Sequence, residues 1–269
     1  MEKTQLGIHG AAGRMGHRLI ALADADPRFE IVAAVDRPDH PHIGQDAGRL
    51  AGIEEIGVPL ASVVRSKPDV VIDFSVPEAA IEIARWCHDH NTALVAATTG
   101  INDEQQHELA RAAGQIPLLW APNMSLAVNL TIQLAAAAAE TLHRVDQDVD
   151  VEIIERHHRF KEDAPSGTAL WFGEIIAARM GQTAHRHGRH GRLGKRPPGE
   201  IGYHALRVGD NPGEHTVVFG LLGESIELTV RATSRDSYAL GALEAAAYLR
   251  GKPAGLYSIA DVLGAGVEG

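Results

Sequence analysis

The chain has one cysteine, Cys87, in 269 residues, which excludes a framework of internal disulfides and is typical of a reducing compartment. Aromatic residues are scarce, at 4%, which argues against a nucleic-acid surface built on base stacking. The formal net charge is −10, so the surface as a whole repels polyanions, and an acidic ligand must be attracted by local cations. We therefore expect no nucleic-acid partner and a local site for a small molecule.

Long hydrophobic runs are also missing. The longest candidate, LAVNLTIQLAAAAAE at 126–140, is shorter than the roughly 18 residues of a membrane span, and Asn129 and Gln133 interrupt it. The first residues, MEKTQLGIHGAAGRMG, lack the apolar core of a signal peptide. These absences predict a cytoplasmic protein with no membrane partner.

The first half of the chain alternates short apolar runs with helical patterns. This rhythm predicts βαβ units on a parallel sheet, and the nearly continuous Val, Ile, Leu and Ala indicate strands covered on both faces. The expected strands are LGIH (6–9), EIVAAVD (30–36), VVIDF (70–74), ALVAATT (93–99) and IPLLWA (116–121).

The rhythm changes after residue 125. A long Ala-rich helix at 126–142 precedes the predicted strand 149–158, and three later runs alternate apolar and polar residues like an antiparallel sheet with one solvated face. Residues 222–225 form the expected hairpin turn between the last two runs. A helix then follows from 237, and we expect the tail to return to the first domain. The predicted architecture is α/β, with a Rossmann-type domain of residues 1–125 and 236–269 and an inserted α+β domain of residues 126–235.

A glycine-rich turn, GAAGRMG, follows the first expected strand and opens a helix. Gly10, Gly13 and Gly16 allow backbone amides to approach a pyrophosphate, although their spacing departs from GxGxxG. Asp36 ends the next strand, 20 residues after Gly16, where a carboxylate can accept hydrogen bonds from ribose. Arg37 suits the 2′-phosphate of NADP, so the pair predicts use of both NADH and NADPH.

Two further strand ends, AATTG at 96–100 and APNMS at 121–125, fall where ligands bind in open α/β sheets. Thr98, Thr99 and Asn123 have side chains that can hydrogen-bond to ribose or nicotinamide. They are further candidates for cofactor binding.

A cluster of titratable residues, ERHHRFKEDAPSGTA, leaves the strand at 149–158. His157 and His158 point to opposite faces of a strand, so they are poor ligands for one metal ion, and we predict no metal site. A turn after His158 can bring Lys161 toward His157. Imidazole and ammonium groups can transfer protons and hold an anionic substrate.

The series Pro, Ser, Gly, Thr at 165–168 predicts a helix start, with Pro165 in the first turn. Backbone amides there, together with the Thr168 hydroxyl, can bind a carboxylate, and Gly167 lets the ligand approach the backbone. A second basic stretch, HRHGRHGRLGKR at 185–196, has no periodicity and no interleaved aromatic residue. We interpret it as a solvated, mobile loop that helps to attract an acidic substrate, in preference to a metal or nucleic-acid patch.

These motifs, together with VIDFSVPEA, APNMSLAVN and RVGDNPGEHTV, closely resemble those of the 4-hydroxy-tetrahydrodipicolinate reductase family, also called dihydrodipicolinate reductase, of the diaminopimelate route to lysine. The resemblance runs almost from end to end. It implies loss of water from a cyclic hydroxy dicarboxylate and hydride transfer from NADH or NADPH to ring carbon four, which gives tetrahydrodipicolinate. It also implies a homotetramer in which the inserted domain binds substrate and carries the oligomer sheet.

The resemblance further assigns roles to single residues. His157 would donate and accept a proton and Lys161 would be a second proton donor, while His158, Gly167 and Thr168 would bind the substrate. The cofactor would contact Gly10, Ala11, Ala12, Gly13, Arg14, Met15, Asp36, Arg37, Ala97, Thr98, Thr99, Ala121, Pro122, Asn123 and Met124.

Two alternatives remain at this point. One is another NAD(P)-linked dehydrogenase of a small acid on the same architecture, which would not require ERHHRFKEDAPSGTA. The other is a nucleotide-sensing regulator without catalysis, which would not need His157 and Lys161 beside a carboxylate site.

Overall fold

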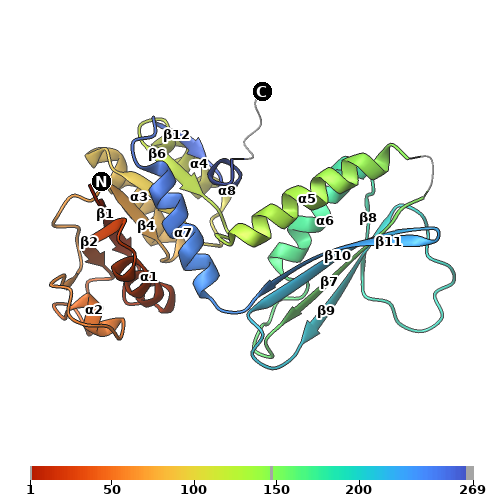
Figure 1. Ribbon diagram of the computed structural model, residues 1–269, viewed down its shortest axis with the longest axis horizontal. Helices are drawn as coiled ribbons and strands as arrows, with labels where there is room; N and C mark the ends of the chain where they lie inside the picture. Colours follow the sequence, from red (N-terminus) through yellow and green to blue (C-terminus); the bar gives the residue numbers. More distant parts are fainter. Residues whose placement is uncertain (1, 146–147, 265–269) are drawn as a thin grey trace. The chain divides into compact units, whose positions relative to one another are not determined.

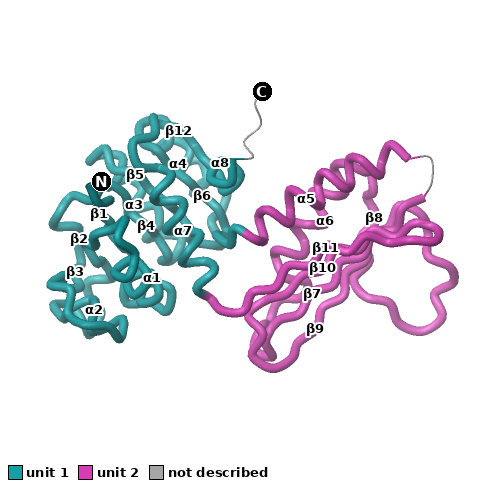
Figure 2. Tube along the Cα trace, in the orientation of Figure 1, with its two compact units in different colours: residues 1–126, 236–269 teal, residues 127–235 magenta. Residues whose placement is uncertain are grey.

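The computed structural model describes residues 2–145 and 148–264. In this part of the chain, contacts define two compact units, coloured separately in Figure 2. Unit 1 comprises the residues up to 126 and those from 236 onward, and unit 2 comprises residues 127–235. No helix among the described residues is long and apolar enough to cross a membrane.

Unit 1 is built on a seven-stranded parallel sheet with helices on both faces (Figure 1). The strand order is β12-β6-β5-β4-β1-β2-β3, so the chain reverses its direction of travel across the sheet between β1 and β4. The prediction of a Rossmann-type fold is confirmed. The strands are β1 (Thr4–His9), β2 (Phe29–Val35), β3 (Leu60–Ala61), β4 (Val70–Asp73), β5 (Ala93–Ala96), β6 (Pro117–Trp120) and β12 (Gly255–Tyr257), and the helices are α1 (Arg14–Ala25), α2 (Ala47–Leu50), α3 (Pro77–His90), α4 (Asp103–Ala113), α7 (Asp236–Leu249) and α8 (Ile259–Val262).

The sheet separates two hydrophobic cores because successive strand side chains point to opposite faces. In β4, Val70 and Ile72 join the core shared with α1 and α7, whereas Val71 joins the core shared with α3 and α4. Cys87 lies fully buried in the second core, and this burial raises the pKa of its thiol. The continuous apolar strands seen in the sequence thus serve a sheet covered on both faces.

Unit 2 contains a five-stranded mixed sheet in the order β11-β10-β7-β9-β8. Helices α5 and α6 cover one face, where Phe172 and Ile176 pack against Val151 and Phe219. The elements are α5 (Leu126–His143), β7 (Asp150–His157), α6 (Gly167–Met180), β8 (Ala184–His187), β9 (Glu200–Arg207), β10 (Gly213–Leu221) and β11 (Glu224–Ala232).

The prediction of an antiparallel sheet is only partly correct. Strand β10 pairs antiparallel with β7 and with β11, and Leu222 and Gly223 form the expected hairpin turn. Strand β9, however, pairs parallel with both β7 and β8. Alternation of polar and apolar residues reports one solvated face, but it carries no information about strand direction.

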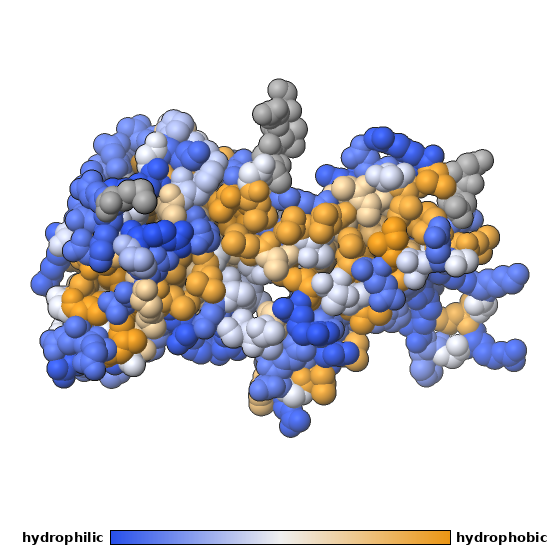
Figure 3. Space-filling view, viewed as in Figure 1, coloured by the Kyte–Doolittle hydropathy of each residue, from blue (hydrophilic) through white to orange (hydrophobic). Residues whose placement is uncertain are grey.

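The sheet face that α5 and α6 leave open has mixed polarity. Ile154 and Leu206 are 38% and 40% exposed, and Thr216 and Thr229 form a cross-strand hydrogen bond of 3.0 Å. Hydrophobic residues also reach the surface of α5, where Leu130 and Leu134 are exposed, and Figure 3 shows hydrophobic surface over this helix. Unit 2 thus has exposed hydrophobic residues both on its open sheet face and on α5.

The basic stretch 185–196 is not simply a solvated, mobile loop. Its first residues belong to β8, and His185 Nδ1 lies 2.8 Å from the hydroxyl oxygen of Tyr203. Arg189 donates two hydrogen bonds of 2.7 Å to Glu152 and one of 2.6 Å to Glu200. The interpretation as a loop is therefore wrong for residues 185–187, whereas nearly all of the stretch is exposed as expected, and carboxylates of β7 and β9 hold Arg189.

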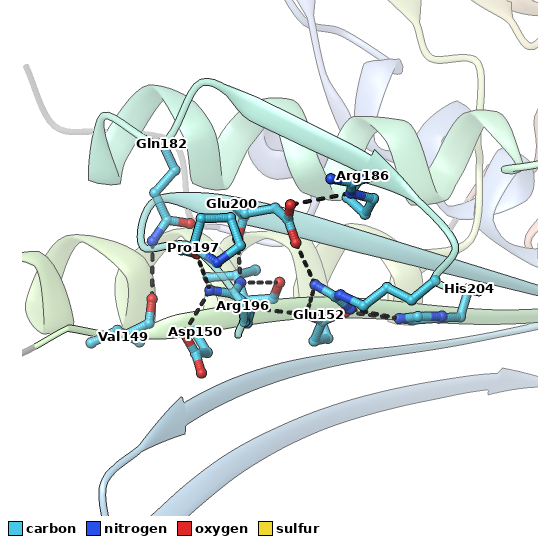
Figure 4. A network of polar contacts seen from close by, with 11 residues as sticks. Val149, Asp150, Glu152, Gln182, Arg186, Arg196, Pro197, Glu200 and His204 are labelled. Atoms are coloured by element: carbon cyan, nitrogen blue, oxygen red, sulfur yellow. Dashed lines mark hydrogen bonds and ion pairs between the residues drawn. The ribbon is translucent and has the colours of Figure 1, made fainter. Parts of the chain in front are cut away.

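Arg196 completes this network, which Figure 4 shows among Asp150, Glu152 and Glu200. Its guanidinium donates to Asp150 at 2.5 Å and to Glu152 at 3.1 Å. Burial favours the neutral acid at Glu152, but hydrogen bonds from Arg189, His204 and Arg196 outweigh it and lower the pKa of Glu152 to about 2. Hydrogen bonds from Arg189 and Arg196 to the ionised Glu152 therefore hold the stretch 185–196 against β7.

Candidate active site

The glycine-rich turn of unit 1 joins β1 to α1 in a close-packed arrangement. Gly10 has a φ of +75°, and a Cβ there would lie 2.5 Å from the carbonyl oxygen of Phe74. A Cβ at Gly16 would lie 2.3 Å from the Gly10 oxygen, so only glycine fits either position. Gly13 precedes α1 without a capping side chain, and no acidic residue lies in the first turn. No carboxylate in the first turn of α1 therefore competes with a bound anion for the free backbone amides of this helix start.

Asp36 lies just after β2 and contacts the same turn. Its carboxylate accepts 2.9 Å hydrogen bonds from the amides of Ala12 and Arg37. The Arg37 side chain is exposed and lies 3.4 Å from Asp39. The structure thus places both predicted ribose-side residues next to the turn, with lone pairs on Asp36 still available to a ligand.

A pocket of about 400 Å³ opens at the carboxyl ends of the strands of unit 1. Seven of the predicted cofactor residues line it, together with Phe74, Ser75 and Tyr238. Ala121 and Asn123 flank the lining residue Pro122, whereas Asp36 and Arg37 do not line the pocket. The seven are Arg14, Met15, Ala97, Thr98, Thr99, Pro122 and Met124.

A buried carboxylate that the sequence analysis missed supports this pocket. Asp73, at the end of β4, is fully buried and lies 2.7 Å from Nδ1 of His9, its partner in β1. It also accepts 2.6 Å hydrogen bonds from the hydroxyls of Ser75 and Thr98. Asp73 therefore orients two pocket-lining side chains at the point where the sheet order reverses.

In unit 2, His157 ends β7 and is nearly buried. Its Nδ1 lies 2.5 Å from Oε2 of Glu155, two residues earlier on the same face of the strand. Burial opposes ionisation of Glu155, but hydrogen bonds from His157 and Arg207 outweigh it and lower the pKa of Glu155 to about 2. An ionised carboxylate therefore contacts the histidine at neutral pH.

Neighbouring strands complete this cluster. Arg207 of β9 donates to both oxygens of Glu155 at 2.8 Å, and the Ser166 amide donates to Oε1 at 3.2 Å. His215 of β10 lies opposite Glu155 in the ladder, with its ring centroid 5.1 Å from that of His157. Burial, followed by the nearby His157, lowers the pKa of His215 to about 4, so His215 is neutral at pH 7.

The segment after β7 turns back at once, as predicted. The Lys161 amide donates to the His158 carbonyl at 3.1 Å, and the Lys161 ammonium pairs with Asp163 at 2.8 Å. Lys161 is close enough to His215 to help lower its pKa. His158 follows the strand and is half-buried. Its Nδ1 is buried with no hydrogen-bond partner among the described residues.

Helix α6 begins at Gly167, and Ser166 caps it by accepting a 3.2 Å hydrogen bond from the Ala169 amide. Pro165 therefore precedes the cap and does not occupy the first turn, because the Ser166 side chain fixes the helix start. Gly167 is exposed and Thr168 is half-buried in the first turn. The Ser166 hydroxyl also lies 3.0 Å from Nε2 of His215, which links the helix start to the histidines.

The functional cluster contains residues that sequence reasoning missed. Glu155 could have been found, because it lies two residues before His157 and strand alternation places both on one face. Arg207 and His215 could not, since they meet Glu155 only through the register of β9 and β10. Among the described residues, no group of three or more His, Cys, Asp or Glu side chains could hold a metal ion.

Comparison with known proteins identifies the family. The model for the N-terminus of dihydrodipicolinate reductase matches residues 4–124, and the model for its C-terminus matches residues 127–263. The chain belongs to the dihydrodipicolinate reductase family. Members include 4-hydroxy-tetrahydrodipicolinate reductase of Rhodopirellula baltica, 54% identical over 267 residues that cover 96% of this chain and 95% of the relative. The enzyme of that name from Alkalilimnicola ehrlichii is 47% identical over 97% of this chain and 99% of its own length.

A solved structure agrees with this family. Dihydrodipicolinate reductase from Paenisporosarcina sp. TG-14, solved with dipicolinate bound, superimposes with a TM-score of 0.78 at 25% identity and covers 96% of this chain and 98% of its own. The chain is therefore an oxidoreductase of the lysine and diaminopimelate route. Both halves of the chain belong to this reductase family. This excludes the two alternatives, another small-acid dehydrogenase and a regulator without catalysis.

Proposed function

We propose that this enzyme reduces 4-hydroxy-tetrahydrodipicolinate to tetrahydrodipicolinate with NADH or NADPH, by way of dihydrodipicolinate and with loss of water. The observation that carries the proposal is the 2.5 Å contact between His157 and the buried Glu155, next to the start of α6, in a member of this reductase family. It combines a proton-transfer group with a site for a carboxylate.

The residues of unit 1 fit a dinucleotide. The turn at Gly10–Gly16 is too crowded for any Cβ at its ends, and the start of α1 offers amides to a pyrophosphate. Arg14 lies at this helix start, and the adjoining pocket would hold the nicotinamide end between Thr98, Thr99 and Met124. When bound, NAD(P)H supplies the hydride. Gly10, Ala11, Ala12, Gly13, Arg14 and Met15 would contact the phosphates, and Ala97, Ala121, Pro122 and Asn123 would complete the nicotinamide side.

We infer that both cofactors are used. Asp36 can accept hydrogen bonds from the ribose hydroxyls of NADH, and the exposed Arg37 can move to pair with the 2′-phosphate of NADPH. The exposed Arg37 side chain can move, because it is not fixed by burial. Arg37 therefore does not exclude NADH, and Asp36 does not exclude NADPH. A preference of more than about a thousandfold in kcat/KM, equal to about 4 kcal/mol, would contradict this inference.

The substrate carboxylate would bind at the start of α6. The amides of Gly167 and Thr168 and the Thr168 hydroxyl are donors there, and no acidic residue lies in this first turn to repel a carboxylate. His158, with a buried Nδ1 that has no partner among the described residues, would donate or accept a further hydrogen bond. His157 and Lys161 would supply the proton that accompanies hydride addition.

We further propose a homotetramer in the cytoplasm, formed through the open face of the unit 2 sheet. The exposed Ile154 and Leu206 on this face support an interface. The buried free thiol of Cys87 suits a reducing compartment.

One assay tests the proposed reaction. The substrate is generated in the cuvette from pyruvate and aspartate semialdehyde by the preceding synthase, and oxidation of NADH and of NADPH is followed separately by loss of the near-ultraviolet absorbance of the reduced nicotinamide. We expect consumption of both cofactors that depends on the synthase product. No consumption of either cofactor, with folded protein, would contradict the proposal.

A further inference from the structure

Glu155 contacts both His157 and the start of α6, the two parts of the candidate site in unit 2. It is 1% exposed and contacts four donor groups: His157 Nδ1, two nitrogens of Arg207 and the Ser166 amide. One contact reaches the proton-transfer residue and another reaches the cap of the helix that would bind the carboxylate.

We propose that Glu155 is a positioning residue that holds the His157 ring with a proton on Nδ1, directs Nε2 toward the substrate, and fixes the start of α6 through Ser166. The inference rests on the proposed role of His157. Glu155 itself touches neither substrate nor cofactor in this scheme.

The tautomer follows from hydrogen-bond chemistry. An ionised carboxylate can only accept hydrogen bonds, so the neutral imidazole that lies 2.5 Å from it must carry its proton on Nδ1. Nε2 is then left with a lone pair that can take a proton and return it. Nε2 faces Gly213, where an ideal Cβ would stand 3.1 Å away, so the glycine keeps space beside the reacting nitrogen.

Arg207 keeps the carboxylate ionised and connects it to the rest of the site. Its two hydrogen bonds of 2.8 Å form a bidentate pair, and the same guanidinium donates to the Asp163 carbonyl at 2.5 Å. Asp163 in turn pairs with the Lys161 ammonium. The strand residue Glu155 is therefore coupled through Arg207 to the loop that carries the second proposed proton donor.

Other charged groups around His157 do not take the place of Glu155 at Nδ1. His215 of β10 faces the His157 ring but is neutral at pH 7, and Arg207 of β9 stays cationic throughout the working range. Lys161 and Glu214 influence the pKa of His215 in opposite directions. Glu155 is the negative group in hydrogen-bond contact with Nδ1 of His157.

The test compares Glu155→Gln with Glu152→Gln, a matched control on the same strand whose side chain also pairs with arginines but lies on the opposite face. A glutamine amide can donate to Nδ1 and thereby select the wrong tautomer. We expect Glu155→Gln to lower kcat about 10²- to 10⁴-fold. The KM for NADPH should be unchanged, and Glu152→Gln should keep the wild-type kcat.

A second measurement does not depend on turnover. Nitrogen-15 NMR of histidine-labelled protein, with the His157 signals assigned from a His157→Gln variant, reports which ring nitrogen carries the proton. We expect Nδ1 in the wild-type protein and Nε2 in Glu155→Gln. A wild-type ring protonated on Nε2 would overturn the proposal, even if Glu155→Gln failed to fold.

An unchanged kcat, with the proton still on Nδ1, in a folded Glu155→Gln variant would also overturn it. That result is distinct from failure of the proposed function, in which His157→Ala would retain full turnover whatever the tautomer.

Discussion

At the scale of single residues, two adjacent histidines differ because of their surroundings. His157 points to the covered face of the sheet and contacts an ionised Glu155, whereas His158 lies beyond the strand end without such a partner. The same side chain can therefore serve proton transfer at one position and substrate binding at the next. Four substitutions test the roles proposed for residues of the candidate site.

Replacing His157 or Lys161 by alanine should lower kcat about 10²- to 10⁴-fold, because each change removes a proton-transfer group. The KM for NADPH should change by no more than about threefold, since neither residue belongs to the cofactor turn. Steady-state kinetics with each substrate varied separates the two effects. Comparable losses in cofactor binding would refute the assignment.

Thr168→Ala should raise the KM for the dicarboxylate about 10- to 100-fold while kcat falls less, because it removes a donor to a charged carboxylate. The matched control is Thr141→Ala on α5, where the hydroxyl donates only to its own helix at Ala137. Initial-rate kinetics checks both variants. An unchanged KM in Thr168→Ala would count against a carboxylate at the start of α6.

Arg37→Ala should raise the KM for NADPH about tenfold or more and change that for NADH by less than about threefold, because only NADPH carries the 2′-phosphate. Arg49→Ala, which removes an exposed arginine paired with Glu55 in the same unit, is the control. The ratio of kcat/KM for the two cofactors is the measurement. Equal effects on both cofactors would remove Arg37 from phosphate recognition.

At the scale of elements, strand β7 carries buried or half-buried acids on both faces. Glu155 serves the candidate site on the covered face, and Glu152 orders the stretch 185–196 on the other. Both carboxylates have a pKa of about 2, and His215 on the adjacent β10 has a pKa of about 4. The stability of unit 2 should therefore depend strongly on pH.

Acid should destabilise unit 2 in two stages. Folding lowers the pKa of His215 below 6.5, so its stabilising contribution, on the order of 2 kcal/mol, is complete above pH 6.5 and is lost between about pH 6.5 and 4. The contributions of Glu152 and Glu155, whose pKa values are also lowered, are complete above about pH 4.5 and are lost as the pH falls toward about 2.

Trp171 is the only tryptophan in residues 127–235, so its fluorescence in a variant with Trp86 and Trp120 replaced by phenylalanine reports unfolding of unit 2. Urea midpoints should fall as the pH is lowered from 7 to 4, and His215→Gln should flatten that slope. A slope that is the same in His215→Gln and in the control His88→Gln would contradict this assignment.

At the scale of the whole molecule, each unit has its own core, and unit 2 leaves apolar groups on its open sheet face. If this face forms the proposed tetramer, Ile154→Asp should dissociate it by burying a charge in the interface. Sedimentation velocity of the wild-type protein should give the mass of four chains, and the variant should give a smaller species. Val63→Asp, at an exposed position of unit 1, should leave the mass unchanged. A wild-type monomer would refute the tetramer.

Much of the fold could be predicted because it depends on local patterns. Continuous apolar runs separated by amphipathic helices require a covered parallel sheet, and the glycines of GAAGRMG require a tight turn at a helix start. Strand direction in unit 2 could not be predicted, since β9 has the same alternation whether it runs parallel or antiparallel to β7. The order in the stretch 185–196 was missed for a related reason, because its partners Glu152 and Glu200 lie far away in the sequence.

The cluster ERHHRFKEDAPSGTA was recognisable from the sequence because its residues are contiguous, as are those of the cofactor turn. Sequence alone thus determined the family, the parallel sheet and the candidate pair His157 and Lys161. Only the tertiary structure decided which groups act on that pair, because Arg207 and His215 reach Glu155 through strand register. Asp73 likewise acquires its partners His9 and Thr98 only where three strands end together. Hydrogen bonds between distant segments depend on register and burial, which no local pattern specifies.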